Sequence, residues 1–318
     1  MIRLREIGRR AAVQMLGSRA LAALRLRRIS GAKALIVLNL HRVAPPDGSA
    51  FPALAPHLFD ELLSYVTRHF SMTSFAQVEE PQPRPRLILS FDDGYRDFLE
   101  YAMPLLDKYG VRANQNVVLA CVESGLPPLQ VLVADFLGRA PEELVARIEV
   151  PGFDMRDPRR CWPRLDAYLR DRPQAERQPI ADMLIPQMMA WQEFRPTPML
   201  NRAQVAEAAS RHDIGGHSFD HASMAFETYG YLRQDVGRCG RWIQDATGRP
   251  MRIYAFPNGS IRAGQPEQVR ALGVEHVLLA GGGLGGSGGI YDRIGVTARS
   301  RNELRFRALG AHAPVPLA

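Results

Sequence analysis

The sequence predicts an α/β fold in which parallel strands are covered by helices. Apolar residues make up 46% of the 318-residue chain, enough to bury a sizeable core. Short aliphatic runs such as residues 34–40 (ALIVLNL) alternate with segments whose apolar residues recur at helical spacing, as in residues 56–69. Repeated strand-then-helix order indicates either a barrel or an open doubly wound sheet.

The individual elements are expected in a regular order along the chain. Strands are expected at residues 34–40, 86–91, 113–119, 213–215, 251–256, 274–279 and 292–296. Helices are expected at residues 56–69, 95–109, 201–211, 229–247 and 267–272. Gly110 is a plausible helix stop, and Asn201 is a good helix N-cap.

Two segments depart from this alternation. Residues 123–197 are rich in proline and arginine with helical patches, which predicts a mostly helical insertion. Residues 1–33 predict a basic N-terminal helix. The expected organisation is therefore this helix, an α/β domain over residues 34–300 that carries the insertion, and a C-terminal tail at residues 301–318.

The positive charge of the chain does not point to nucleic acid. The formal net charge is +7, and Lys33 and Lys108 are the only lysines. So strong an arginine bias is typical of coding composition rather than of selection for one ligand. No aromatic stacking motif accompanies the basic residues, so we expect no nucleic-acid partner. The basic N-terminal helix either lies on an anionic membrane surface or packs on the domain.

The cysteines and the lengths of the apolar segments indicate in which cellular compartment the protein is expected. Cys121, Cys161 and Cys239 are widely spaced and form no Cys-x-x-Cys pair, which argues against a disulfide framework or a zinc knuckle. The N-terminus lacks the apolar run and cleavage site of a secretory signal. No segment approaches the roughly 20 apolar residues of a membrane span. We expect a cytoplasmic protein, with or without contact to the membrane surface.

Six polar or ionisable residues that could take part in binding or catalysis stand directly after predicted strands. They are His41, Asp92, Asp93, His217, His221 and Asn258. The carboxyl ends of parallel strands meet at one edge of a barrel or sheet, which is where the active residues of such folds gather. The sequence therefore predicts that these residues belong to one site.

Two pairs within this set suggest a metal ion. Asp92 and Asp93 would repel each other if both were ionised and dry, and a bound cation removes that repulsion. His217 and His221 stand four residues apart, one helical turn, so both imidazoles can face one ion. Each pair also has a simpler interpretation, because Asp-Asp-Gly is good turn chemistry and histidines at this spacing are common. An aspartate and two histidines leave positions open for water and substrate, and such a site suits amide or ester hydrolysis.

These residues lie in motifs that resemble a known family. Residues 90–94 (SFDDG) resemble the T/S-F-D-D-G motif of the polysaccharide deacetylase family with the NodB homology domain, carbohydrate esterase family 4. Residues 217–221 (HSFDH) match its H-S/T-x-x-H motif, and residues 256–259 (FPNG) are similar to its third motif. The segment around His41 resembles the Y-H-R-V that opens some exopolysaccharide deacetylases. The resemblance spans residues 34–296, interrupted by the insertion.

The resemblance implies a fold, a cofactor and residue roles. The implied fold is a distorted (β/α)7 barrel of the NodB type. Asp92 would be the catalytic base, and Asp93, His217 and His221 would hold a divalent metal ion. Zn²⁺ is the first expectation for this ion, with Co²⁺ and Mn²⁺ as the other candidates.

The chain also departs from the family pattern. The third motif normally reads R-x-P-Y-G, but Ala255 stands at the arginine and Asn258 at the tyrosine. The backbone N–H of Asn258 can still serve an oxyanion hole. Arg42, Arg252 and Arg293 are the candidates to replace the arginine that steadies the base.

The family's L-x-x-H motif, which carries the general-acid histidine, is not found near the C-terminus. His41 is the best substitute, and a structural role for His41 is equally open. The expected function is removal of N-acetyl groups from an acetylated amino sugar or polysaccharide intermediate. The alternatives are a metal-dependent O-deacetylase or amidase on another substrate, and a catalytically weak or inactive glycan-binding protein.

Overall fold

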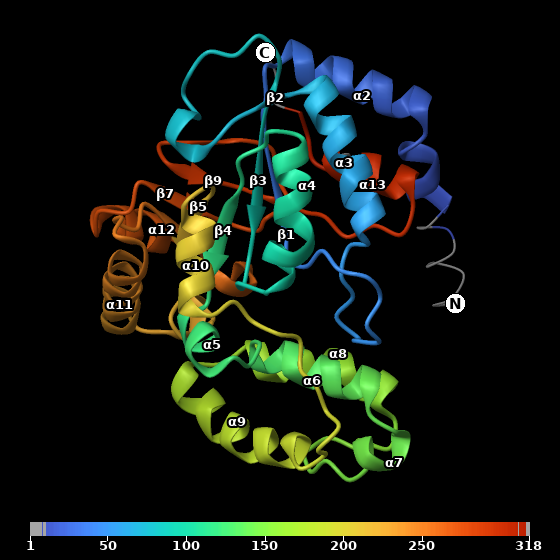
Figure 1. Cartoon of the computed structure of the whole chain (residues 1–318), viewed down its shortest axis with the longest axis vertical. Coiled ribbons are helices and arrows are strands. Elements are labelled where there is room, and N and C mark those ends of the chain that lie inside the picture. Colours follow the sequence, from blue (N-terminus) through green and yellow to red (C-terminus); the bar gives the residue numbers. More distant parts are fainter. Residues whose placement is uncertain (1–7, 9–10, 311, 316–318) are drawn as a thin grey trace.

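The computed structural model describes residue 8, residues 11–310 and residues 312–315, and it shows a mixed α/β fold built on one curled sheet (Figure 1). The sheet has ten strands in the order β10-β1-β3-β4-β5-β6-β7-β9-β8, with β2 paired to β3. All pairs are parallel except that of β8 and β9. The strands are β1 (Leu35–Leu40), β2 (Ser71–Met72), β3 (Arg86–Phe91), β4 (Asn114–Val117), β5 (Asp213–Gly216), β6 (Ile253–Ala255), β7 (His276–Leu278), β8 (Gly286–Ser287), β9 (Ile290–Tyr291) and β10 (Ile294–Gly295).

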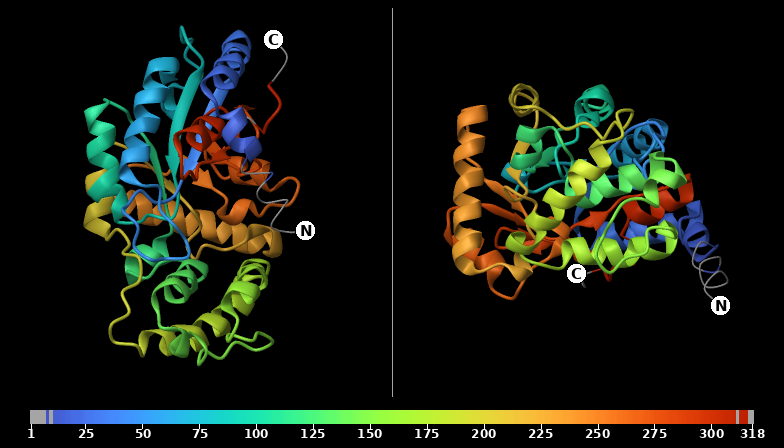
Figure 2. Two further views of the ribbon diagram at one scale, coloured as in Figure 1. Left: turned by 90° about the vertical axis from the view of Figure 1, so that its right-hand side faces the viewer. Right: turned by 90° about the horizontal axis from the view of Figure 1, so that it is seen from below.

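Helices cover the outside of this sheet (Figure 2). Those of the α/β domain are α3 (Pro56–His69), α4 (Met103–Lys108), α5 (Leu119–Ser124), α10 (Arg202–Ala209), α11 (Tyr229–Thr247), α12 (Gln265–Ala271) and α13 (Arg301–Ala308). The predicted N-cap Asn201 forms a capping box with Gln204 at the start of α10. The helix expected at residues 95–109 differs in its first half, where residues 98–102 form a π-helical segment before α4 begins.

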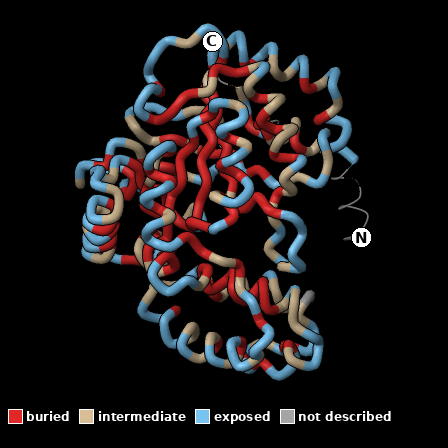
Figure 3. Tube along the Cα trace, in the orientation of Figure 1, coloured by how far each residue is buried: buried red, intermediate tan, exposed pale blue. Residues whose placement is uncertain are grey.

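The core of the molecule surrounds the central strands (Figure 3). All six residues of β1 are buried, as its aliphatic run predicts. β1 and β3 pair along their full lengths, with Leu40 beside Phe91. Because the last residues of the two strands are paired with each other, the residues that follow them, His41 and Asp92, lie side by side at the carboxyl edge of the sheet. The predicted (β/α)7 barrel of the NodB type is thus confirmed in a curled form whose edge strands are β10 and β8.

The predicted insertion is mostly helical and lies at one end of the sheet. It contains α6 (Leu129–Arg139), α7 (Glu142–Val145), α8 (Pro158–Arg170) and α9 (Gln174–Met189). Figure 1 and the left view of Figure 2 both show these helices beyond the carboxyl ends of the strands. They have an apolar cluster of their own, which includes Leu132, Leu165 and Leu184. The insertion is therefore a packed layer next to the end of the sheet where the predicted site lies.

Two helices from opposite ends of the described part of the chain contact each other. Helix α2 (Arg19–Gly31) buries Ala22 and Ile29 and contacts α13, and Arg25 donates hydrogen bonds to carbonyl oxygens of residues 309, 310 and 313. Most of the predicted helix before residue 11 lies outside the described residues. Among the helices that the structure describes, none is long and apolar enough to cross a membrane.

Candidate active site

Asp93, His217 and His221 converge at the carboxyl edge of the sheet. Asp93 Oδ1 lies 3.4 Å from Nε2 of His217 and 3.3 Å from Nε2 of His221. The three side chains are buried, and one ligand atom of each lies within 4.8 Å of the other two. Asp93 Oδ1 accepts no hydrogen bond from the described residues. A buried carboxylate oxygen without a donor is costly unless a cation or water completes it.

The backbone around these residues turns sharply. Asp93 has φ +76°, Ser218 has φ +61° and His221 has φ +53°, all in the left-handed region. The expectation that His217 and His221 occupy one turn of a helix is therefore wrong, because residues 217–221 form an irregular loop after β5. The loop nevertheless brings the two imidazole rings to 5.1 Å between centroids. Strand geometry followed by tight turns, rather than helical spacing, assembles the three ligand atoms.

Hydrogen bonds from the histidine rings fix which nitrogen faces Asp93. Nδ1 of His217 lies 2.9 Å from the carbonyl oxygen of Ala255, which can only accept, so Nδ1 carries the proton. The lone pair of His217 is thereby left on Nε2, toward Asp93. Burial lowers the pKa of His217 to about 4 despite the nearby carboxylates of Asp92 and Asp93. A neutral imidazole with a free Nε2 is the form that binds metal ions.

Asp92 lies in a different environment from that of its neighbour. Its Oδ1 accepts hydrogen bonds from Arg293 at 2.7 Å and from Asn116 at 2.8 Å. Its Oδ2 lies 3.9 Å from Nε2 of His217. Burial alone would raise the pKa of Asp92, but the charge of Arg293, helped by His217 and His41, holds it well below its usual range. Asp92 is therefore kept ionised and fixed in orientation.

Of the three candidates for the arginine missing at Ala255, Arg293 is the one that contacts Asp92. Its side chain is 1% exposed and also donates to Asn39, Ser90 and the carbonyl oxygen of Leu279. The other two candidates lie elsewhere. Arg42 forms ion pairs with Asp47 and Asp97, and Arg252 lies near Glu275 at the opposite end of the strands.

One segment of the chain, which includes part of the site, matches a known protein family. Residues 191–277 match the model of the family described as polysaccharide deacetylase. The resemblance to that family is confirmed. The matched segment includes both histidines and begins after the two aspartates. No curated protein matches the sequence. Over this segment the chain is similar to polysaccharide deacetylases.

Solved structures of several deacetylases share the fold of this chain. The Streptococcus pyogenes deacetylase PplD in complex with acetate is 15% identical, with a TM-score of 0.58 over 86% of this chain and 98% of that one. IcaB from Ammonifex degensii is 18% identical, with a TM-score of 0.55 over 87% and 97%. The BpsB deacetylase domain from Bordetella bronchiseptica is 17% identical, with a TM-score of 0.52 over 84% and 97%. At these identities the likeness is one of fold.

The structure places His41 and Asn258 near the same edge of the sheet. His41 follows β1, its ring packs edge-on against Phe51, and its charge contributes to lowering the pKa of both Asp92 and Asp93. Asn258 follows β6 with φ +58°, and its side chain donates a hydrogen bond to Ser223 Oγ at 3.0 Å. The side chain of Asn258 is thus committed to the loop after His221.

Three residues around the site were not predicted from the sequence. Asn116 bonds Asp92, Tyr95 donates from its hydroxyl to Asp93 Oδ2 at 2.8 Å, and Gln130 lies 3.0 Å from Nδ1 of His221. Asn116 had a signal, because it belongs to a run of three polar residues, 114–116, within the predicted strand. Gln130 had none, since it belongs to the insertion and meets His221 only through the fold.

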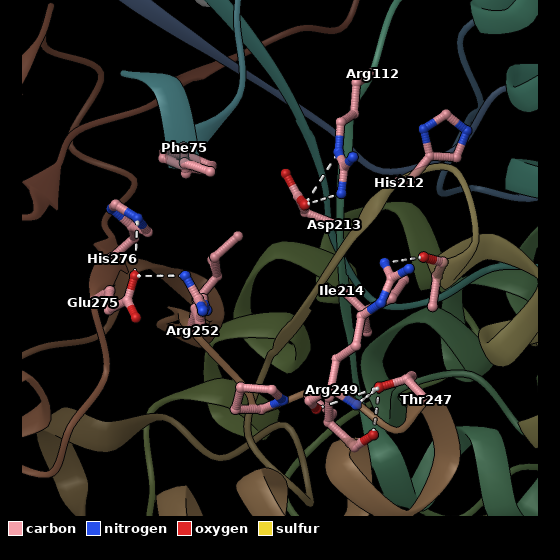
Figure 4. A pocket seen from close by; sticks show the side chains of 15 residues that line it. Phe75, Arg112, His212, Asp213, Ile214, Thr247, Arg249, Arg252, Glu275 and His276 are labelled. Carbon is pink, nitrogen blue, oxygen red and sulfur yellow. Dashed lines mark hydrogen bonds and ion pairs between the residues drawn. The ribbon is translucent and has the colours of Figure 1, made fainter. Parts of the chain in front are cut away.

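The other end of the same strands carries a separate cavity of about 280 Å³ (Figure 4). Arg112 pairs with Asp213 there at 2.6 Å, and Arg252 lies 3.5 Å from Glu275. These charged groups are paired with one another and partly exposed to solvent. This cavity contains none of the predicted site residues.

Proposed function

We propose that this chain removes N-acetyl groups from an acetylated amino sugar, using a divalent metal ion. The observation that carries the proposal is the buried Oδ1 of Asp93, which has no hydrogen-bond donor among the described residues and faces Nε2 of both His217 and His221. One oxygen and two imidazole nitrogens are a donor set that suits Zn²⁺, and also Co²⁺. A divalent ion held by these residues would supply Lewis-acid chemistry, by polarising a carbonyl oxygen and acidifying water.

In the proposed reaction Asp92 accepts a proton from the attacking water. Its Oδ1 is engaged by Arg293 and Asn116, so Oδ2 is the oxygen that we assign to proton transfer. The low pKa of Asp92 keeps it ionised, and the two donors hold the carboxylate in one orientation. A fixed, ionised carboxylate within reach of the water is what general-base catalysis requires.

His41 and Asn258 complete the proposal. We assign His41 to protonation of the departing amine, because it lies close enough to the carboxylates to affect the pKa of both. We assign the backbone N–H of Asn258 to the oxyanion that forms when water adds to the acetyl carbon. The bond from the Asn258 side chain to Ser223 supports this role, since it fixes the turn in its left-handed conformation.

The test is acetate release from N-acetylglucosamine oligomers with added Zn²⁺ or Co²⁺. We expect Asp92→Asn to lower kcat by about 10²- to 10⁴-fold, because the base is lost. We expect His217→Ala to abolish both metal binding and acetate release. Asp220→Asn is the matched control in the same loop: Asp220 pairs with Arg238 at 3.4 Å and is not among the three ligands.

The outcomes separate this proposal from its alternatives. A protein that binds no Zn²⁺ and no Co²⁺ contradicts it. Metal binding without acetate release from any N-acetylated sugar would favour a glycan-binding protein. Release from O-acetylated but not N-acetylated substrates would favour an O-deacetylase.

Contact of the N-terminal region with an anionic membrane is also part of the proposal. Leu16 and Leu24 are 40% and 54% exposed beside the basic residues of α2. Exposed leucines among arginines can add apolar and electrostatic contacts to an anionic lipid surface. We expect co-sedimentation with vesicles that contain phosphatidylglycerol, weakened by Leu24→Asp. Equal binding to purely zwitterionic vesicles would contradict this part of the proposal.

A further inference from the structure

His221 is the predicted metal ligand that contacts the helical insertion. Its Nδ1 lies 3.0 Å from Nε2 of the Gln130 side-chain amide in α6, and Oε1 of the same amide has no hydrogen-bond partner among the described residues. Its carbonyl oxygen accepts a hydrogen bond of 2.6 Å from Arg177 in α9. Gln130 is 9% exposed and Arg177 is 4% exposed, so water competes little for either contact. One helix of the insertion therefore contacts the ring of His221, and a second helix contacts its backbone carbonyl.

The contact with Gln130 controls the tautomer of His221. A glutamine amide can present either its oxygen or its nitrogen to a partner by turning over. If the oxygen faces Nδ1, then Nδ1 carries the proton and donates it, and the lone pair of His221 lies on Nε2, toward Asp93. If the nitrogen faces Nδ1, the proton moves to Nε2 and the ring cannot bind a metal ion through that atom. The structure places the nitrogen at Nδ1, so metal binding through Nε2 requires the Gln130 amide to turn over and present its oxygen to Nδ1–H.

The contact with Arg177 acts on the backbone. His221 has φ +53°, a conformation that a histidine adopts only when its surroundings hold it there. The hydrogen bond from Arg177 holds the carbonyl at this turn. A second link joins the same regions, because the backbone N–H of Gln174, at the start of α9, donates to the Glu227 side chain at 2.5 Å.

His217 provides a contrast within the same site. Its Nδ1 is held by the carbonyl oxygen of Ala255 in β6, which is part of the sheet itself. A backbone carbonyl can only accept, so the tautomer of His217 is set by the barrel alone. The tautomer of His221 depends on a side chain from the insertion.

We propose that the helical insertion is a positioning device for the metal site, in which Gln130 sets the tautomer of His221 and Arg177 fixes its backbone. This inference rests on the proposed function, because it assumes that His221 binds a metal ion. Gln130 and Arg177 are positioning residues, since they act through His221 rather than on substrate. Residues of the insertion would then be required for metal affinity without being ligands.

The experiment measures Zn²⁺ affinity by competition with a chromogenic chelator, on the full chain. We expect Gln130→Leu to weaken Zn²⁺ binding by about 10- to 100-fold, the usual effect of losing the partner of a ligating histidine. We expect Gln130→Glu to bind within about threefold of the unaltered protein, because its carboxylate accepts from Nδ1–H as the amide oxygen does. Gln187→Leu is the matched control, since Gln187 lies in α9 and accepts a hydrogen bond from the backbone of Glu149 instead.

Each outcome decides for or against the inference. Weak binding by Gln130→Leu together with rescue by Gln130→Glu supports it. Unchanged affinity in Gln130→Leu overturns the inference and leaves the proposed function intact. An equal loss in Gln187→Leu also overturns it, because the loss would then reflect general loosening of the insertion. If the unaltered protein binds neither Zn²⁺ nor Co²⁺, the proposed function fails first and this inference fails with it.

Discussion

Charged groups at the two ends of the strands β3 to β7 lie in opposite environments. At the carboxyl ends, Asp92 and Asp93 are 2% and 3% exposed and lie next to each other in the chain. At the amino ends, the side chains of the pair Arg112–Asp213 are 49% and 20% exposed. Both ends carry arginines, aspartates and histidines, yet only the carboxyl end forces like charges together out of water.

This difference shows why residue types alone do not identify a site. Exposed ion pairs such as Arg112–Asp213 contribute little and are screened by solvent. A buried carboxylate is costly unless specific partners compensate it. At the carboxyl end Arg293 compensates Asp92, while the Oδ1 of Asp93 has no donor among the described residues. That uncompensated oxygen is the observation on which we base the proposal that Asp93 binds a metal ion.

The largest effect that would test the comparison is expected from Arg293→Met. Removing the guanidinium leaves Asp92 as a buried ion held by Asn116, so we expect a loss of about 3–5 kcal/mol in the free energy of unfolding. The pKa of Asp92 should rise, because the positive charge that favours its ionised form is gone. The activity should therefore fall about 100-fold, with its acid limb displaced to higher pH. Chemical denaturation and the pH profile of acetate release measure these effects.

Arg252→Met is the control at the opposite end. Arg252 is an exposed arginine beside Glu275, so we expect a change below about 0.5 kcal/mol and no shift in the pH profile. Similar losses of stability in the two variants would break the contrast between the two ends of the strands.

A smaller effect is expected from His212, the buried histidine at the amino end. His212 is 1% exposed, its Nδ1 accepts a hydrogen bond from the backbone of Ala113, and burial lowers its pKa to about 4. The unfolded chain binds a proton at about pH 6.5, whereas the folded chain does so only near pH 4. Stability is therefore fully present above pH 6.5 and is lost as the pH falls toward 4, by about 3 kcal/mol for this group.

His212→Asn keeps an acceptor for Ala113 and removes the titrating ring. We expect the melting temperature of the metal-free variant to fall less steeply between pH 7 and pH 5 than that of the unaltered protein. Some slope should remain, because the pKa of His217 is also lowered to about 4. If the melting temperatures of the two proteins fall equally between pH 7 and pH 5, His212 is not the group that couples stability to pH.

Much of the site can be predicted from the sequence because it depends on local features. The aliphatic run of β1 and the segment before Asp92 are strands by composition, and residues that follow parallel strands share an edge. The convergence of Asp93, His217 and His221 follows from that rule together with the motif resemblance. The helical turn expected for residues 217–221 was wrong, because Ser218 and His221 adopt left-handed conformations that spacing does not reveal.

The sequence by itself determined the order of the main strands and helices, the insertion, and the three residues, Asp93, His217 and His221, that meet at the carboxyl edge of the sheet. Only the tertiary structure decided which of Arg42, Arg252 and Arg293 compensates Asp92, since each lies next to a different strand and the sequence does not tell which of them reaches Asp92. Only the tertiary structure brought Gln130 and Arg177 of the insertion to His221, across 91 and 44 residues. The physical reason is that strand propensity acts over a few residues, whereas the partner of a buried charge is set by which distant segments pack together.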